Sequence, residues 1–170
     1  MKFADFHVGQ KLRFGPERIT EDEIVAFARE YDPQWFHVDV ERAKASRWQG
    51  LIASGWQTCG IAMRLIVEGA LSESESFGSP GLEYLKWLAP VRPGDALTVN
   101  AEVLDVRRSE SRPSLGIVRW RWQVVNQKDV AVLELVATSL FDLGGPIHCP
   151  SGHVDDRVGP AGIEPATKRL

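Results

Sequence analysis

The stretch GLIASGWQTCGIAMRLIVEG, residues 50–69, decides the fold of this 170-residue chain. From position 56 to position 67 its clearly polar residues are three, Gln57, Thr58 and Arg64. A helix that is apolar almost all round has to be enclosed by the rest of the protein. Gly55 lies near the start of the run and Gly69 just past its end, at positions suited to helix termini. The stretch therefore predicts a buried central helix.

After this helix the sequence changes from a helical period to a period of two. Apolar and polar side chains alternate over residues 97–103 and 117–124, and a third long run extends over residues 130–141. Such alternation is typical of strands with one buried face. Turns are predicted at 93–95 and 126–129. Long strands with short connections pair antiparallel, because a parallel crossover needs about a dozen residues or more.

Before the central helix, Thr20 and Glu23 have the spacing of a capping box, in which each side chain accepts a hydrogen bond from the other residue's backbone N–H. A helix is predicted to begin there and to end before Pro33, because proline disfavours the helical conformation in the residue before it. The helix is amphipathic and is expected to pack on a core. Its predicted core-facing side chains are Ile24, Phe27, Ala28 and Tyr31.

Four other segments complete the outline. A short strand is predicted ahead of Gly15-Pro16, which end it, and Asp39 is predicted to cap a further helical turn. The Ser/Glu-rich residues 69–80 have no periodicity and predict a mobile surface loop. Residues 144–170 are rich in Gly and Pro and predict a flexible tail. Residues 1–143 then form one α+β domain, an antiparallel sheet wrapped around the buried central helix.

Length and composition bound the class of protein. A chain of 170 residues, 44% of them apolar, supports one hydrophobic core. The net charge of −3 argues against nucleic acid as a partner, because phosphate-binding surfaces need an excess of Lys and Arg. The two cysteines lie far apart, and no apolar run has the length of a signal peptide or a membrane span. These features predict a cytoplasmic protein without disulfides that does not enter a membrane.

The segment YDPQWFHVD, residues 31–39, contains the candidate catalytic residues. Asp32 lies where the first helix ends, and a carboxylate there opposes the negative end of the helix dipole, which hints at another use. His37 follows the apolar pair Trp35 and Phe36. An Asp and a His beside apolar walls form a candidate acid–base pair, since burial and charged neighbours tune the pKa of either group.

Other interpretations of these residues stay open. Asp-Pro commonly starts a turn, so Asp32 can simply bond its own backbone, and His37 can be a satisfied core histidine. A metal site from Asp32, His37 and Asp39 is conceivable, but no second histidine or cysteine pair lies nearby, so no metal is predicted. The chain has no P-loop or dinucleotide-binding glycine pattern, and no cofactor is predicted.

The sequence around this segment resembles the MaoC-like hot-dog family, which includes the (R)-specific enoyl-CoA hydratases. The family pattern G-D-x-N-P-[LIV]-H-x5-[AS] has its Asp, its His and its final small residue at Asp32, His37 and Ala43. Residues 52–55, Ile-Ala-Ser-Gly, resemble the start of the family's central helix. Residues 88–103 resemble its later strand motif, P-V-x-x-G-D-x-L.

The resemblance covers roughly residues 8–142 and has two departures near the candidate pair. The Gly that precedes the Asp in the family is Tyr31 here. The family's Asn-Pro is replaced by Gln34-Trp35. Gln34 retains an amide that can hold the loop, whereas Trp35 puts a large ring where a small one is usual. The departures are expected to affect the size of the substrate and the reaction rate, and they leave the acid–base pair in place.

The resemblance implies a hydratase or dehydratase that acts on an acyl thioester. Asp32 and His37 would hold one water, add it to the β-carbon of a 2-enoyl-CoA and deliver a proton to the α-carbon, giving a 3-hydroxyacyl-CoA. Free backbone N–H groups near Gly55 and Trp56, at the start of the central helix, would bind the thioester oxygen. Ser54 would hydrogen-bond the substrate or the water.

These residues also have simpler interpretations. Ser54 is a good helix cap, and Gly55 suits a helix start packed against the sheet. Cys59, one turn into the central helix, is expected to be a small core residue rather than a reactive thiol.

The resemblance further implies an acyl-CoA or acyl carrier protein thioester as substrate, and a homodimer or higher homo-oligomer with sites near the interface. Trp120 and Trp122 offer large apolar surface for such an interface. Four basic residues are candidates for the CoA phosphates, Arg107, Arg108, Arg119 and Arg121. Two alternative functions remain, thioester hydrolysis and acyl-CoA binding without turnover.

Overall fold

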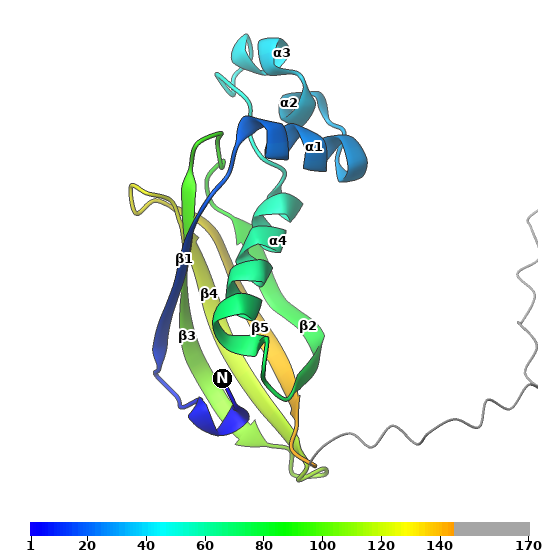
Figure 1. Cartoon of the computed structure of the whole chain (residues 1–170), viewed down its shortest axis with the longest axis vertical. Helices are drawn as coiled ribbons and strands as arrows, with labels where there is room; N and C mark the ends of the chain where they lie inside the picture. Colours follow the sequence, from blue (N-terminus) through cyan, green and yellow to red (C-terminus); the bar gives the residue numbers. More distant parts are fainter. Residues whose placement is uncertain (145–170) are drawn as a thin grey trace, which may run out of the picture.

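A five-stranded antiparallel sheet curves around one long helix in the computed structural model, which describes residues 1–144 (Figure 1). The order of strands across the sheet is β1-β3-β4-β5-β2. The strands are β1 (Lys11–Arg18), β2 (Ser76–Trp87), β3 (Ala96–Arg108), β4 (Leu115–Val125) and β5 (Ala131–Asp142). The predicted α+β architecture is confirmed. The predicted tail, residues 144–170, lies outside the described residues except for its first residue.

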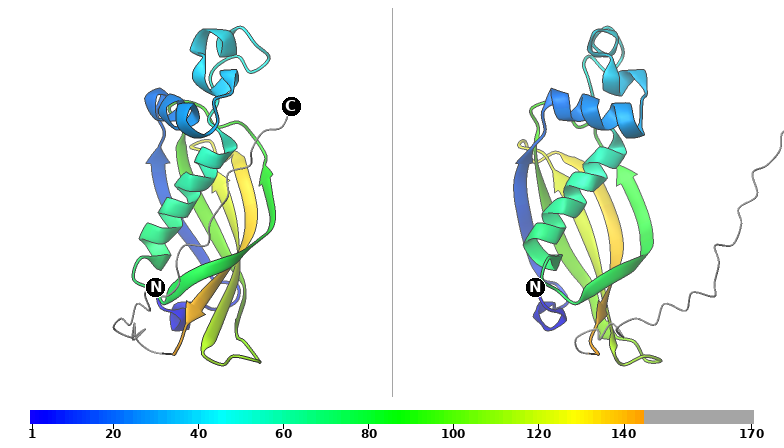
Figure 2. Two further views of the ribbon diagram at one scale, coloured as in Figure 1. Left: turned by 90° about the vertical axis from the view of Figure 1, so that its right-hand side faces the viewer. Right: turned by 45° about the vertical axis from the view of Figure 1, so that its right-hand side comes forward.

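The long helix, α4 (Gly55–Ile66), lies across the concave face of the sheet, and the shorter helices form an overhang beyond one end of the sheet (Figures 1 and 2). The overhang consists of α1 (Glu21–Tyr31), α2 (Trp35–Val38) and α3 (Val40–Lys44). A 3₁₀ turn, η1 (Phe3–Asp5), lies at the opposite end, and a π-helical turn, η2 (Val67–Leu71), extends α4. Thr20 and Glu23 form the predicted capping box of α1, and Asp39 caps α3 by accepting from the backbone N–H of Arg42.

The core lies between α4 and the concave face of the sheet. The alternating residues of β3 and β4 that face α4 are almost fully buried, among them Val99 and Trp120. The ring of Phe6 packs edge-on against Trp120 and also contacts Phe141, so the N-terminal segment closes one end of the core. Trp120 donates its indole N–H to Ser139 Oγ over 3.2 Å, which satisfies the polar atom of a side chain with no solvent exposure.

The central helix is enclosed on one side only. Ala62 and Ile66 face the sheet and are fully buried, but Trp56 is 62% and Met63 43% exposed. The prediction of a helix buried all round is therefore wrong for one face, because sequence hydrophobicity does not distinguish a core from a surface that another molecule covers. Gly69 lies inside the π-helical turn rather than past the end of the helix.

Two predicted boundaries are also wrong. The strand β1 continues through Gly15-Pro16 to Arg18, with an irregularity in its pairing to β3 between Phe14 and Glu17 that accommodates the proline. Residues 76–80 belong to β2 rather than to a mobile loop. This edge strand pairs with β5 through register shifts around Gly78 and Gly81, and these shifts break the period-two pattern. Tyr31, predicted to face the core, is 65% exposed at the end of α1.

The buried Trp120–Ser139 hydrogen bond gives a test of the core. Replacing Ser139→Ala leaves the indole N–H without an acceptor, and an unsatisfied buried donor costs about 1–3 kcal/mol. We expect the free energy of unfolding to fall by that amount in denaturant titrations. The matched control is Ser111→Ala in the exposed β3–β4 loop, where surface substitutions change stability by about 0.5 kcal/mol or less. Equal stability of the two variants would contradict this account of the core.

Candidate active site

Asp32 and His37 come together where α1 ends and α2 begins. Asp32 is the C-terminal cap of α1, and its backbone N–H donates to Ala28 O over 2.9 Å. Pro33 then turns the chain, so that His37 points back toward α1. His37 Nε2 lies 3.3 Å from Asp32 Oδ2. The His37 side chain is 5% exposed and that of Asp32 is 18% exposed, so the pair faces solvent only through the carboxylate.

The orientation of the His37 ring is fixed by the backbone before α4. Its Nδ1 lies 2.7 Å from the carbonyl oxygen of Ile52. A carbonyl only accepts, so Nδ1 carries a proton and Nε2 is the atom that faces Asp32. The Ile52 segment is itself held on both sides, because Ile52 N–H donates to Phe36 O and Ala53 N–H donates to Val91 O. The imidazole therefore has one defined rotation and one defined tautomer when it is neutral.

The two oxygens of Asp32 have different surroundings. Oδ2 accepts from Ser54 Oγ over 2.7 Å and also faces His37, whereas Oδ1 accepts only from Gln34 Nε2 over 2.8 Å. Partial burial raises the pKa of Asp32, but the hydrogen bonds from Ser54 and Gln34 and the charge of His37 outweigh it and lower the pKa below its usual value. Asp32 is thus an ionised carboxylate at neutral pH, able to accept a proton.

Ser54 connects this carboxylate to the start of the central helix. Its buried hydroxyl donates to Asp32 and accepts from the backbone N–H of Trp56, which makes Ser54 the N-cap of α4. The single hydroxyl proton is therefore given to Asp32 rather than to a ligand. The helix-cap interpretation of Ser54 agrees with this geometry.

Gly55 and Trp56 form the first turn of α4 at the same place. The ring of Trp87, from β2, lies so close to Gly55 that a Cβ atom there would be 2.4 Å from its Cε2 atom. Gly55 is therefore required for packing against the sheet, as one interpretation proposed. Its backbone N–H has no hydrogen-bond partner within residues 1–144. The exposed ring of Trp56 packs edge-on against Trp87.

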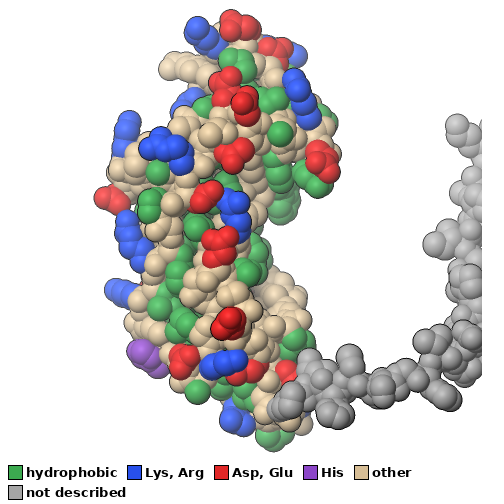
Figure 3. Space-filling view, viewed as in Figure 1, with side chains coloured by type: hydrophobic (Ala, Val, Ile, Leu, Met, Phe, Trp, Pro, Cys, Tyr) green, Lys and Arg blue, Asp and Glu red, His purple; other side chains and the backbone are tan. Residues whose placement is uncertain are grey.

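These residues line a cavity of about 470 Å³ whose other walls are mainly apolar. Asp32, His37, Gly55 and Trp56 border it together, whereas Ser54 lies behind its wall. In the space-filling view the outline of the molecule is indented below the overhang, with hydrophobic side chains along the rim (Figure 3). The sequence did not single out Trp48, Thr58, Trp87 and Val132 as lining residues, and they have no shared local pattern.

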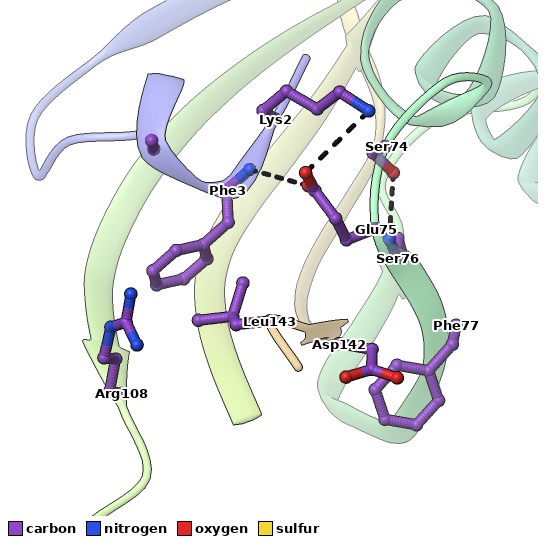
Figure 4. Close-up of a pocket in the computed structure, with 10 residues that line it drawn as sticks. Lys2, Phe3, Ser74, Glu75, Ser76, Phe77, Arg108, Asp142 and Leu143 are labelled. Carbon is purple, nitrogen blue, oxygen red and sulfur yellow. Dashed lines mark hydrogen bonds and ion pairs between the residues drawn. The ribbon is translucent and has the colours of Figure 1, made fainter. Parts of the chain in front are cut away.

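A larger cavity of about 600 Å³ lies at the opposite end of the sheet (Figure 4). Its polar groups are engaged with one another: Glu75 accepts from the backbone N–H of Phe3 and pairs with Lys2. Asp142 accepts from the backbone N–H of Gly144. Its lining contains no histidine, so it has no Asp–His pair. The smaller cavity is therefore the candidate active site.

Several other sequence-based candidates lie elsewhere. Arg107, Arg119 and Arg121 are paired with Asp105, Glu83 and Glu102 on strands of the sheet, and Arg108 lines the larger cavity. Trp120 and Trp122 are buried in the core, so they offer no surface to a partner. Burial raises the pKa of the Cys59 thiol, which agrees with a packing role.

Within residues 1–144 no three His, Cys, Asp or Glu side chains cluster closely enough to hold a metal ion. No helix in the same range is long and apolar enough to span a membrane.

Comparison with known proteins supports one family. The chain matches the family described as MaoC like domain over residues 4–124. It is 36% identical over 134 residues to the uncharacterized protein YdeM of Bacillus subtilis, covering 79% of this chain and 94% of that one. The MaoC-like dehydratase from Rhodospirillum rubrum is 39% identical, with a TM-score of 0.76 and coverage of 82% and 94%.

The fold extends to more distant proteins. The R-hydratase PhaJ1 from Pseudomonas aeruginosa shares 24% identity at a TM-score of 0.63, over 82% of this chain and 84% of that one. At this identity the likeness concerns the fold alone. The family match and the similar structures together confirm the hot-dog architecture that the sequence motifs indicated. With most of its described residues inside the family match, and with an Asp–His pair beside the first turn of its central helix, this chain belongs to the MaoC-like dehydratase family.

Proposed function

We propose that this protein is a hydratase/dehydratase that adds water reversibly to a 2-enoyl thioester and yields a 3-hydroxyacyl thioester. The observation that carries the proposal is the Asp32–His37 pair, 3.3 Å apart, on the wall of an apolar cavity beside the free N–H of Gly55. The family supports hydratase chemistry in general. The 2-enoyl substrate and the roles of individual residues go beyond the family match and are part of the proposal.

Asp32 is assigned the role of base because it is ionised at neutral pH and can accept a proton. In the proposed reaction Asp32 and His37 hold one water, the carboxylate takes a proton from it, and the oxygen adds to the β-carbon of the substrate. The pair then delivers a proton to the α-carbon, so that one water is added across the double bond and no cofactor is consumed. Dehydration follows the same steps in reverse.

The substrate needs stabilisation as well as a base. As oxygen adds to the β-carbon, negative charge develops on the thioester oxygen. Hydrogen-bond donors fixed at that position lower the barrier, and removal of one such donor in other enzymes costs about 10²–10³-fold in rate. The free N–H of Gly55, at the positive end of the α4 dipole, is the donor we propose. Trp87, which covers Gly55, shields this contact from water.

The proposed partners are an acyl-CoA or acyl carrier protein thioester and a second copy of this chain, in the cytoplasm. The exposed face of α4 and the adjoining edge strand β2 form one apolar surface. It consists of Trp56, Met63, Phe77, Leu82, Trp87 and Leu88, each at least 43% exposed. A two-fold interface uses the same surface on both subunits, and a surface that crosses an open strand edge suits such pairing.

The catalytic pair gives the main test. We expect Asp32→Asn and His37→Ala each to lower kcat by about 10²-fold or more, because each removes a proton-transfer group. The rate is followed as loss of the conjugated enoyl absorbance of a panel of 2-enoyl-CoA esters, with circular dichroism as the check on folding. Asp39→Asn is the matched control, since Asn also caps α3. Wild-type rates in both site variants would rule out this site.

The products separate this function from its alternatives. Hydration removes the enoyl absorbance without releasing free thiol. Thiol released at the same rate would show thioester hydrolysis instead. Binding of acyl-CoA without any turnover would show a binding module.

The hydrogen bonds to Asp32 predict a pH effect. Ser54→Ala and Gln34→Ala each remove a hydrogen bond that lowers the pKa of Asp32. In each variant this pKa is expected to rise, so that Asp32 becomes protonated, and inactive as a base, at a higher pH. The acidic limb of kcat/KM against pH, which reports the free enzyme, is expected to move to higher pH in both variants. Gln34 is exposed and takes no part in the α4 cap, so its variant separates the pKa effect from loss of helix stability. An unchanged acidic limb in both variants would contradict Asp32 as the base.

The proposed dimer has its own test. Met63→Glu puts a charge on the exposed face of α4 outside the cavity lining, and we expect it to convert the protein to a monomer in sedimentation measurements. The control is Val8→Glu, an exposed apolar position in the N-terminal segment. An unchanged mass for Met63→Glu would exclude this surface as the interface.

A further inference from the structure

Two arginines on the overhang have unoccupied guanidinium groups. Arg42 and Arg47 are exposed and make no ion pair, and their guanidinium groups make no hydrogen bond within residues 1–144. Other arginines of the described chain are neutralised by carboxylates, for example Arg64 by Glu17 and Arg119 by Glu83. Within residues 1–144 these two guanidinium groups therefore have hydrogen-bond donors that no acidic side chain or carbonyl engages.

Both guanidinium groups lie over tryptophan rings. The Arg42 Cζ atom is 4.6 Å from the ring centre of Trp35, and the Arg47 Cζ atom is 5.0 Å from that of Trp48. A guanidinium held over a ring keeps the N–H donors at its edge free, in the planar fork that matches a phosphate. The stacking also restricts the side chain in advance, so less freedom is lost when a ligand binds.

Trp48, under Arg47, lines the candidate cavity, whereas Trp35, under Arg42, contacts the lining residue Phe36 at 5.3 Å between ring centres. The Trp48 ring centre is 6.1 Å from that of Phe36, and the Phe36 ring is 4.4 Å from that of His37. Arg47 thus lies at the rim of the cavity, separated from the acid–base pair by two aromatic rings. A ligand whose reacting group contacts His37 and whose chain leaves past Trp48 would bring its far end to Arg47.

The Trp48 segment is held in place rather than loose. Arg92 donates to the carbonyl oxygen of Trp48 over 2.7 Å, and the backbone N–H of Trp48 donates to Ser46 Oγ over 3.1 Å. The Ser46 hydroxyl in turn donates to the carbonyl oxygen of Ala43 in α3. These bonds fix Trp48 relative to α3 and to Arg92. The two residues before Arg92, Pro90 and Val91, line the cavity.

We propose that Arg42 and Arg47 bind the phosphate groups of a phosphopantetheine thioester at the mouth of the catalytic cavity. The inference rests on the proposed function, which places the thioester beside His37. The pantetheine arm separates the thioester from the phosphates, so the phosphate site must lie away from the catalytic pair, and the Trp48 and Phe36 rings separate Arg47 from His37. Coenzyme A and acyl carrier protein both carry this chemistry, and the experiment distinguishes them.

The test compares one enoyl group on two carriers, coenzyme A and pantetheine without phosphate. The double variant Arg42→Gln/Arg47→Gln is expected to lower kcat/KM for the CoA ester by about tenfold or more, mainly through KM, because charge-assisted contacts are lost. The rate with the pantetheine ester is expected to stay within about twofold, since it carries no phosphate. The double variant Lys11→Gln/Arg112→Gln, at exposed positions in β1 and in the β3–β4 loop, is the matched control for loss of two positive charges.

An equal loss of kcat/KM with the CoA and pantetheine esters would assign Arg42 and Arg47 a structural role and overturn the proposal. Unchanged kcat/KM with both phosphate-bearing carriers, CoA and acyl carrier protein, would also overturn it. Loss with enoyl-acyl carrier protein but not with CoA would assign the same site to the protein carrier. Calorimetry with butyryl-CoA tests the site without turnover. Weaker binding by the double variant supports the site even where wild-type protein fails to hydrate any enoyl ester, and equal binding overturns it.

Discussion

The structure of the site depends on the hydrogen bond between Ser54 and Asp32. It joins the end of α1 to the start of α4, two helices that are far apart in the sequence. A carboxylate at the C-terminal end of a helix is unfavourable, because it faces the negative end of the helix dipole. Here the same carboxylate lies beside the N-cap of α4, where the dipole is positive and negative charge is stabilised. The second helix thus compensates for the first, and the base is held at the junction of both.

The sheet contributes the remaining walls, and it does so through its edge strand. Trp87 at the end of β2 covers Gly55, so the cavity exists only when the last strand in the sheet order is in place. The same strand carries part of the apolar surface proposed for the dimer. In the proposed dimer, assembly and catalysis would be coupled through β2, since a displacement of this strand would move both the cover of the α4 N-terminus and the subunit contact.

Sequence reasoning succeeded where the determinants are local. The Thr20–Glu23 box, the proline that ends α1 and the alternation in β3 and β4 each depend on neighbouring residues, and all are present. The edge strand β2 was missed because glycines interrupt its period and only one of its sides is paired. The pairing of Asp32 with His37 followed from their spacing and the family motif, but Trp48 and Trp87 line the cavity through tertiary packing that no local pattern records. The exposed face of α4 was missed for a similar reason, because the sequence does not distinguish apolar residues on a surface from apolar residues in a core.

The separation of the base from the proposed phosphate site has an electrostatic reason. A general base works best when its pKa lies close to the working pH, and the pKa of Asp32 is already lowered by Ser54, Gln34 and His37. A guanidinium in direct contact would lower it further and weaken the base. Salt and water reduce the influence of a charge beyond about 8–10 Å, so in the proposed site an arginine on the outer side of the Trp48 ring would attract the carrier with less effect on the carboxylate than one in direct contact. The aromatic rings of the overhang thus keep two opposing electrostatic requirements apart within one binding site.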